Sequence, residues 1–249
     1  MAHFLIVFNI AGLFGLIPPD GSPKTLIQCN HSGQPGPTQH IFFPFFLVFM
    51  RLTIYIKIKI ILQEFMSFFV EVGVCDFDTC EQLIRNGWKG LMIEPITYYF
   101  NNIKKYPDIH YENVAVSDIS GETEMHFINP EIIVGKSNQW LKGISSINGK
   151  GCFSYNKDTP LFKNCKKQKV KTYTLNYLCE KYNIKNIDFL KIDTEGHDFH
   201  VLKSIDLNCI YVKMIKIEHK HVSHNEIIEY LKARNYIVYM EKEDIYAIK

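Results

Sequence analysis

Five acidic residues stand at or near the ends of short apolar stretches, and this spacing suggests a ligand site. Glu94, Asp118, Asp193 and Glu218 each follow such a stretch, and Glu71 lies near the end of the first one. If the stretches are parallel strands, their carboxyl ends meet at one edge of a sheet, where open α/β sheets bind ligands. Carboxylates gathered there repel one another unless a ligand with hydroxyl, amine or positively charged groups uses them. A phosphate-rich ligand such as NAD or ATP does not suit such an edge.

The stretch of residues 68–95, FFVEVGVCDFDTCEQLIRNGWKGLMIEP, predicts a strand, a tight turn at Gly73, a short helix and a second strand ending at Glu94. Glycine lacks a Cβ, so the backbone can turn sharply there and a ligand can approach it closely. Glu94 lies about twenty residues after this turn. At this distance, α/β nucleotide sites place a carboxylate against ribose hydroxyls. Cys75 and Phe77 stand where a phosphate loop carries glycines. We therefore weigh a cofactor-binding half-site against an ordinary βαβ unit without a ligand.

The composition indicates a folded protein with no strongly charged surface. The chain has 249 residues, a formal net charge of +2 and 22% charged residues, so we expect no nucleic-acid partner. Its length suits one sizeable α/β domain with an extension. The seven cysteines are scattered and include no C-x-x-C pair, which favours a reducing compartment over a disulfide framework or a zinc site. We accordingly expect a cytoplasmic protein.

Residues 1–62 differ from the rest of the chain and are predicted to be a non-core extension before a domain at residues 63–249. They hold two apolar runs, separated at residues 18–38 by a linker rich in proline and glycine. The second run begins with the ten uncharged residues 41–50, about half of what a spanning helix needs. Membrane contact through residues 41–62 is therefore less favoured than a docked hydrophobic arm or a poorly ordered extension.

From residue 63 onward, predicted strands alternate with predicted helices, which is typical of a largely parallel sheet covered on both faces. A closing β-hairpin makes the sheet mixed. The predicted strands are residues 68–72, 91–93, 109–116, 122–128, 170–173, 187–192, 212–218, 236–240 and 245–248. The predicted helices are residues 79–86, 97–106, 175–182 and 199–204, with one more around residues 227–231. Residues 129–165 show little periodicity and are predicted to form loops beside the site.

Four segments, VEVGVCDFDT, IEP, AVSDISGE and DFLKIDTEGHDFHVLKS, resemble in their order the FkbM family of S-adenosylmethionine-dependent methyltransferases. The resemblance covers roughly residues 68–248, and its most specific part is LKIDTEG. It implies a Rossmann-like class I fold, a seven-stranded mixed sheet with the last strand antiparallel and helices on both faces. It also implies S-adenosyl-L-methionine as the cofactor and O-methylation of a hydroxyl, with a small molecule or a glycan such as a sugar as the acceptor.

The resemblance further implies a cofactor site built from the first turn and from the ends of later strands. Its members are Glu71, Gly73, Val74, Cys75, Asp76, Glu94, Pro95, Ser117 and Asp118. The first five receive the methionine part of the cofactor, Glu94 takes the ribose hydroxyls, and Ser117 with Asp118 faces the adenine. Asp193 and Glu195 stand beside the methyl group and the acceptor.

Methyl transfer to a hydroxyl requires in-line placement of the reacting atoms and gains from a base that removes the proton. The candidates for this catalytic role are Asp193, Glu195, His197 and His219. Asp193 is favoured by its place at a strand end, whereas a histidine has the better matched pKa near neutrality. The alternatives are structural: Asp193 as a helix N-cap and Glu195 as a first-turn carboxylate favoured by the helix dipole.

Other interpretations remain open at this point. A convergence of His197 and His200 with His219, His221 and His224 could bind a metal, but a solvated polar strand end is favoured and no metal ligand is assigned. A Rossmann-like binding protein that has lost its cofactor affinity is the main functional rival. A dehydrogenase is a second rival, but it requires a glycine-rich phosphate turn that residues 74–77 do not supply.

Overall fold

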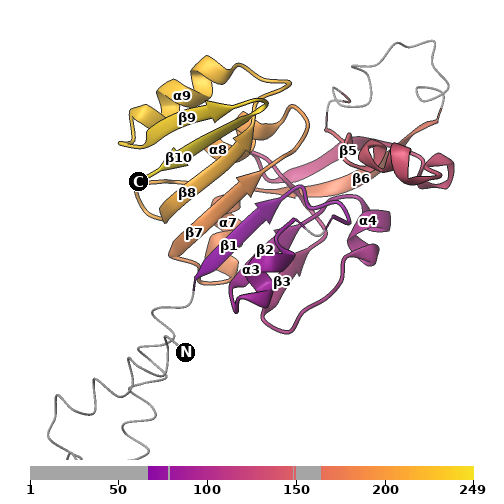
Figure 1. Cartoon of the computed structure of the whole chain (residues 1–249), viewed down its shortest axis with the longest axis horizontal. Helices are drawn as coiled ribbons and strands as arrows, with labels where there is room; N and C mark the ends of the chain where they lie inside the picture. The colour runs from indigo at the N-terminus through magenta and orange to yellow at the C-terminus, as the bar shows by residue number, and fades with distance from the viewer. Residues whose placement is uncertain (1–66, 78, 148, 150–163) are drawn as a thin grey trace, which may run out of the picture. The chain divides into compact units, whose positions relative to one another are not determined.

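The structure, a computed structural model, describes residues 67–249 except residues 78, 148 and 150–163. The described residues form an α/β fold with one large and one small sheet (Figure 1). The expectations for residues 1–62, including membrane contact through residues 41–62, lie outside the described part. Within that part, no helix has the length and apolar character that crossing a membrane demands.

The large sheet has seven strands in the order β3-β2-β1-β7-β8-β10-β9. Five of them run parallel, and β10 lies antiparallel between β8 and β9. The strands are β1 (Phe68–Val72), β2 (Lys89–Ile93), β3 (Ile109–Glu112), β7 (Asn186–Ile192), β8 (Tyr211–Glu218), β9 (Ile237–Glu241) and β10 (Asp244–Ile248). This arrangement confirms the predicted Rossmann-like class I sheet with its antiparallel hairpin.

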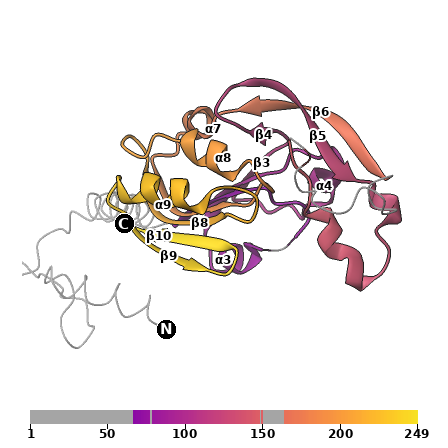
Figure 2. The same cartoon turned by 90° about the horizontal axis from the view of Figure 1, so that it is seen from above.

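Helices cover both faces of this sheet. They are α3 (Glu81–Arg85), α4 (Thr97–Asn102), α7 (Leu175–Lys181), α8 (Asp198–Lys203) and α9 (His224–Lys232). The largest hydrophobic cluster joins α7, α8 and α9 to one face, through residues such as Leu178, Leu202 and Leu231. A smaller cluster around Phe69 and Met92 packs against α3 and α4 on the other face. Figure 2 shows α7, α8 and α9 on one side of the sheet and α3 on the other.

The small sheet holds β4 (Ala115–Val116), β5 (Gly121–Ile128) and β6 (Cys165–Tyr173) in the order β4-β6-β5. The prediction of one strand over residues 109–116 is therefore wrong, because β3 and β4 belong to different sheets. Asn113 lies between them, and its side-chain amide donates to the carbonyls of Glu94 at 2.8 Å and Pro95 at 3.0 Å. These two bonds hold the chain where it leaves one sheet for the other.

Two further element boundaries differ from the prediction. The helix expected at residues 97–106 ends at Asn102, because Ile103 is extended (φ −61°, ψ 127°) and is buried in the cluster around Phe69. Residues 129–165 are not all loop, since they contain the 3₁₀ helices η1 (Pro130–Ile132) and η2 (Lys136–Lys142) and the first residue of β6. β6 begins earlier than expected because it pairs with the whole of β5.

Gly73 ends β1 at a point where neighbouring strands enclose the backbone. Its N–H donates to the carbonyl of Ile93 at 3.0 Å, and the N–H of Asp193 donates to the carbonyl of Val72 at 3.1 Å. The φ of Gly73 is +86°, and a Cβ at this position would lie 1.8 Å from the carbonyl oxygen of Asp193. Glycine is thus required here both by the left-handed backbone and by the close approach of the chain after β7.

Replacing Gly73 by alanine should therefore destabilise the fold by far more than the left-handed backbone conformation alone. Gly87 is the matched control, because its φ is +84° but a Cβ there meets nothing within 4 Å. Gly87→Ala should lower the free energy of unfolding by about 1–2 kcal/mol for the left-handed conformation. Gly73→Ala should lower it by at least about 2 kcal/mol more, because of the steric clash. Urea denaturation of both variants measures the difference, and equal losses would contradict the close approach.

Candidate active site

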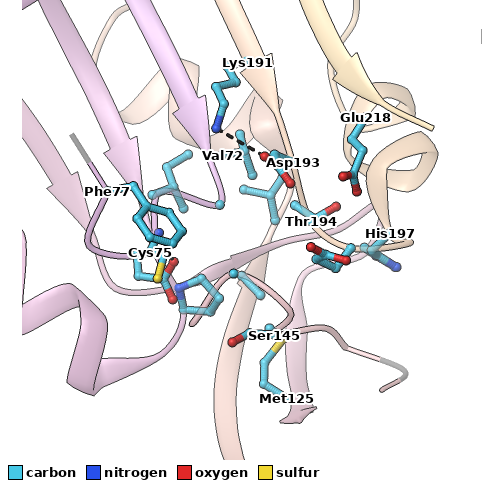
Figure 3. Close-up of a pocket in the computed structure, with 18 of the residues that line it drawn as sticks. Val72, Cys75, Phe77, Met125, Ser145, Lys191, Asp193, Thr194, His197 and Glu218 are labelled. Atoms are coloured by element: carbon cyan, nitrogen blue, oxygen red, sulfur yellow. Dashed lines mark hydrogen bonds and ion pairs between the residues drawn. The ribbon is translucent and has the colours of Figure 1, made fainter. Parts of the chain in front are cut away.

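A cavity of about 570 Å³ opens at the carboxyl ends of β1, β2, β7 and β8. Residues of the small sheet and of the segment after η2, such as Met125 and Ser145, form its other wall (Figure 3). Its volume lies within the usual range of about 300–1,000 Å³ for small-molecule sites. The cavity is thus where a ligand is expected in an open α/β sheet.

Seven of the proposed cofactor-binding and catalytic residues line this cavity. Four come from the proposed cofactor set and three from the proposed catalytic set: Gly73, Cys75, Glu94, Pro95, Asp193, Glu195 and His197. They come from the ends of three different strands, so the fold brings together residues that are up to 124 positions apart in the chain.

Three residues of the proposed cofactor set do not line the cavity and have other surroundings. Glu71 is fully buried within β1 and accepts a hydrogen bond from Lys191 at 3.1 Å. Val74 packs in the core beside α3 and α4. Asp76 forms an ion pair with Lys142 at 2.9 Å, which links the first turn to the end of η2. Glu71 and Asp76 thus each contact a lysine of the cavity lining.

Ser117 and Asp118 also lie outside the cavity lining, in contact with two histidines of the loop and helix after β7. The Ser117 hydroxyl lies 2.9 Å from Nε2 of His197, and Asp118 Oδ2 lies 2.9 Å from Nδ1 of His200. The hydrogen bond with His200 holds the pKa of Asp118 below its ordinary value. The two imidazole rings stack with their centroids 4.5 Å apart. The structure thus joins the end of β4 to the start of α8.

His219 is the one catalytic candidate that does not line the cavity. Its Nε2 lies 3.1 Å from the carbonyl of Lys242 in the β9–β10 turn, and its ring contacts that of His224. His221 lies elsewhere, with Nε2 3.1 Å from Glu195. The histidines that the sequence suggested might converge are therefore divided among separate contacts.

Glu94 is the most enclosed acid of the lining, with only 4% of its surface exposed. Its Oε2 accepts the backbone N–H of Cys75 and its Oε1 accepts that of Ile96, both at 2.7 Å. Burial nevertheless raises the pKa of Glu94 to about 7, and the neighbouring Asp76 acts in the same direction. Each oxygen can accept a further hydrogen bond, so Glu94 both fixes the first turn and can receive a ligand hydroxyl.

Cys75 takes the place in the first turn where glycine was expected. Its φ is +55°, in the left-handed region that glycine favours, and its side chain is buried. Burial raises the pKa of the Cys75 thiol, with the charges of Glu94 and Asp76 adding to the effect, so this side chain is a neutral packing group. The bond from its N–H to Glu94 holds the conformation that a glycine would adopt more easily.

Asp193, Glu195 and Glu218 form what we call the acid cluster. One carboxylate oxygen from each lies within 4.8 Å of the others. Burial, together with the charge of Asp193, raises the pKa of Glu195 to about 7 and that of Glu218 to about 9. Oε2 of Glu218 is buried and accepts no hydrogen bond from the described residues. Around neutral pH, Glu218 therefore holds a proton and can donate it in a hydrogen bond.

The turn that carries Asp193 and Glu195 is held by Asp198. This fully buried carboxylate accepts the N–H groups of Thr194 at 2.7 Å and Gly196 at 2.9 Å. The turn includes Glu195 at φ +51°. α8 begins at Asp198 with His197 in the N-cap position, so Asp193 does not cap that helix. Because Asp198 accepts the backbone N–H groups of the turn, the side chain of Asp193 is not needed to stabilise it.

The cavity lining includes three lysines that the pattern of acids did not indicate, and two of them, Lys191 and Lys216, lie in strands. A signal for both was present. Side chains two apart in a strand share one face, and Lys191 precedes Asp193 by two residues as Lys216 precedes Glu218. The acids are evident at the strand ends, whereas both lysines lie within the strands.

Comparison with known proteins identifies the family. The family described as Methyltransferase FkbM domain matches residues 71–238, which include the first turn, the acid cluster and most of the sheet. Searches of curated proteins and of solved structures found no match. The match agrees with the observed sheet order and with the cavity at the strand ends. The chain belongs to the FkbM methyltransferase family.

Proposed function

We propose that the chain is an S-adenosylmethionine-dependent O-methyltransferase that acts on a hydroxyl of a sugar, a glycan or another small metabolite. The observation that carries the proposal is the cavity in which Gly73, Glu94 and Asp193 meet, within a fold whose family is methyltransferase. The family match speaks against the dehydrogenase alternative. Against a binding protein that has lost its cofactor affinity stand Glu94 and the pair Asp193 and Glu195, which all line the cavity.

The residues of the cavity fit such a cofactor. Gly73 lines the cavity without a side chain, so a ligand can approach the backbone at the strand end closely. Glu94 keeps acceptor capacity on both oxygens for a pair of ribose hydroxyls. The acid cluster supplies further acceptors, suited to an amino group and to a positively charged sulfur. No phosphate group has to be accommodated, which agrees with the glycine-poor turn.

S-adenosylmethionine would supply a methyl group bound to a positively charged sulfur. An oxygen–carbon bond would form as the carbon–sulfur bond breaks, and the sulfur would keep the electron pair of the broken bond. The protein has to hold the acceptor hydroxyl in line and remove its proton. Asp193 is the candidate base that removes this proton, because it follows β7 at the cavity and its side chain is 39% exposed. Glu218, protonated near neutral pH, can donate a hydrogen bond to the acceptor.

An aromatic side chain of the cavity lining offers a surface for the acceptor. Trp140 of η2 lines the cavity and is 46% exposed, so its ring can stack on a sugar. Among the described residues, Cys75, Cys80, Cys179 and Cys209 form no disulfide, which supports our proposal of a cytoplasmic setting.

Cofactor binding should depend on Glu94. Glu94→Gln removes an ionisable acceptor, and its amide would place a donor against a backbone N–H, so affinity for S-adenosylmethionine should fall about ten- to hundredfold. Glu112→Gln is the matched control, because Glu112 is a buried strand-end carboxylate that does not line the cavity. Isothermal titration calorimetry measures both. Unchanged affinity in Glu94→Gln would refute this assignment, and no binding by the folded wild-type protein would favour the binding-protein alternative.

Affinity for the cofactor should also rise with pH. The pKa of Glu94 is raised to about 7, so the side chain is protonated below that pH and loses its strongest acceptor form. By linkage, the same shift lowers the stability of the free protein as pH rises from about 4.5 to about 7, because only the folded state keeps the proton there. Calorimetric titrations between about pH 6 and pH 8 should show tighter binding at the upper end.

This pH dependence should be absent in Glu94→Gln and present in Glu195→Gln. The second variant is needed because the pKa of Glu195 also lies at about 7. A pH dependence that survives in Glu94→Gln would assign the proton to another group of the cavity.

Asp193→Asn should separate binding from catalysis. An amide cannot take the acceptor's proton, so methyl transfer should fall by at least about a hundredfold, while affinity for S-adenosylmethionine changes only a few-fold. The measurement is formation of S-adenosylhomocysteine in a screen of sugars and small hydroxylated acceptors. Asp206→Asn is the control, since Asp206 is an acid outside the cavity that accepts the N–H of Asn208. Equal rates in wild type and Asp193→Asn would exclude this residue as the base.

A further inference from the structure

Three side chains form a polar row across the centre of the large sheet. In the parallel register, Glu71 of β1 stands beside Lys191 of β7, which stands beside Lys216 of β8. Neighbours in such a register project from the same face. Lys191 is 6% exposed and Glu71 is fully buried, so two opposite charges lie inside the sheet next to the cavity. Charged residues at that depth are rare unless they are paired.

Lys191 contacts two carboxylates at once. Its Nζ lies 3.1 Å from Oε1 of Glu71 and 3.4 Å from Oδ2 of Asp193. Figure 3 shows the ammonium group directed at the Asp193 carboxylate, with a dashed line for this contact. Burial by itself would lower the pKa of Lys191, but the charges of Glu71 and Asp193 raise it above its ordinary value. The lysine therefore keeps its positive charge beside Asp193.

The other two members of the acid cluster have different neighbours. Glu195 contacts His221, and among the described residues Glu218 forms no ion pair of 4 Å or less. Lys216, although it lines the cavity, has its Nζ 2.9 Å from Asp244. Three carboxylates this close cannot all carry a full charge without a large energetic cost. The ammonium group of Lys191 lies where it favours negative charge on Asp193.

We propose that Lys191, held by Glu71, is a positioning residue that directs the Asp193 carboxylate into the cavity and keeps the negative charge of the acid cluster on it. Asp193 is then the group that takes the acceptor's proton, while Glu195 and Glu218 act as neutral or hydrogen-bonding neighbours. This inference rests on the proposed function for its catalytic meaning. The arrangement of the charge itself can be tested without cofactor or acceptor.

Several charged or titratable groups lie around Asp193. They come from β1, β7, β8 and the segment that follows β7, and they are Glu71, Lys191, Lys216, Glu218, Glu195, His197 and Asp198. The carboxylates among them disfavour charge on Asp193. Lys191 is the cation within ion-pair distance of Asp193 among the described residues, so its removal should change the charge of that carboxylate most.

The test compares variants of the full-length protein by carbon-13 NMR of aspartate carboxyl groups, with Asp193 assigned by Asp193→Asn. At pH 6 the wild type should show Asp193 at the position of a carboxylate. Lys191→Met should move that signal toward the position of the protonated acid, and Lys191→Arg should restore it. Lys216→Met is the matched control, because it removes a neighbouring cavity lysine that pairs with Asp244, and it should leave the signal in place.

A lone Glu71 left without its partner could unfold the protein, since an unpaired buried charge is costly. The double variant Glu71→Gln/Lys191→Met leaves no such charge, and it should show the same displaced Asp193 signal as Lys191→Met. An Asp193 signal that stays at the carboxylate position in a folded variant without Lys191 would overturn the proposal. So would a displaced signal that Lys191→Arg fails to restore.

Kinetics with an acceptor found by screening add the functional half of the test. Lys191→Met should lower kcat at pH 7 at least about tenfold with KM for the cofactor changed less than about threefold, and should move the acidic limb of the kcat/KM profile to higher pH. Lys191→Arg should recover most of the rate. Failure of the wild type to bind S-adenosylmethionine would refute the proposed function, whereas the NMR result would still decide the role of Lys191. A purely structural lysine would give no shift of the pH profile.

Discussion

β1 and β7 pair in parallel at the centre of the large sheet, and their register places Glu71 beside Lys191. The same pairing brings Gly73 so close to Asp193 that only glycine fits. Both features lie at the carboxyl end of β7, where the chain continues into the acid cluster. The position of Asp193 is thus set from two sides, by the backbone of the first turn and by a buried ammonium group.

The buried pair of Glu71 and Lys191 does not need to stabilise the fold in order to be useful. Removing two charges from water costs several kcal/mol per ion, and their attraction often only offsets that cost. Apolar residues of similar size, like those of the neighbouring clusters, would fill the same space at lower electrostatic cost. An ammonium group differs from them in one respect, which is the field it exerts on Asp193 at 3.4 Å. The site therefore gains a fixed positive charge beside the acid cluster.

Much of the sheet could be predicted from the sequence, because its buried strands are short apolar runs that end in polar residues. The first strand, Phe68–Val72, and the closing hairpin follow directly from such runs. The break between β3 and β4 could not be predicted, since it depends on hydrogen bonds from Asn113 to a segment nearly twenty residues earlier. The early end of α4 depends likewise on where Ile103 is buried. Long-range contacts of this kind leave no local pattern.

The candidate site shows the same division. Glu94, Asp193 and Glu218 could be located from strand ends alone. The spacing of Lys191 and Asp193 indicates a shared face, but the pairing of Lys191 with Glu71 depends on which strand lies beside β7. The first turn lacks the glycines expected of a cofactor site, and the structure shows how the turn forms without them. Cys75 adopts the left-handed conformation, and its N–H is held by the carboxylate of Glu94 at 2.7 Å. Left-handed backbone at a residue other than glycine costs about 1–2 kcal/mol, and a hydrogen bond to a charged group returns about 1.5–3 kcal/mol. Glu94, the acid expected to bind the ribose, thus also stabilises the turn. The absence of glycines in the turn is therefore compatible with a cofactor site.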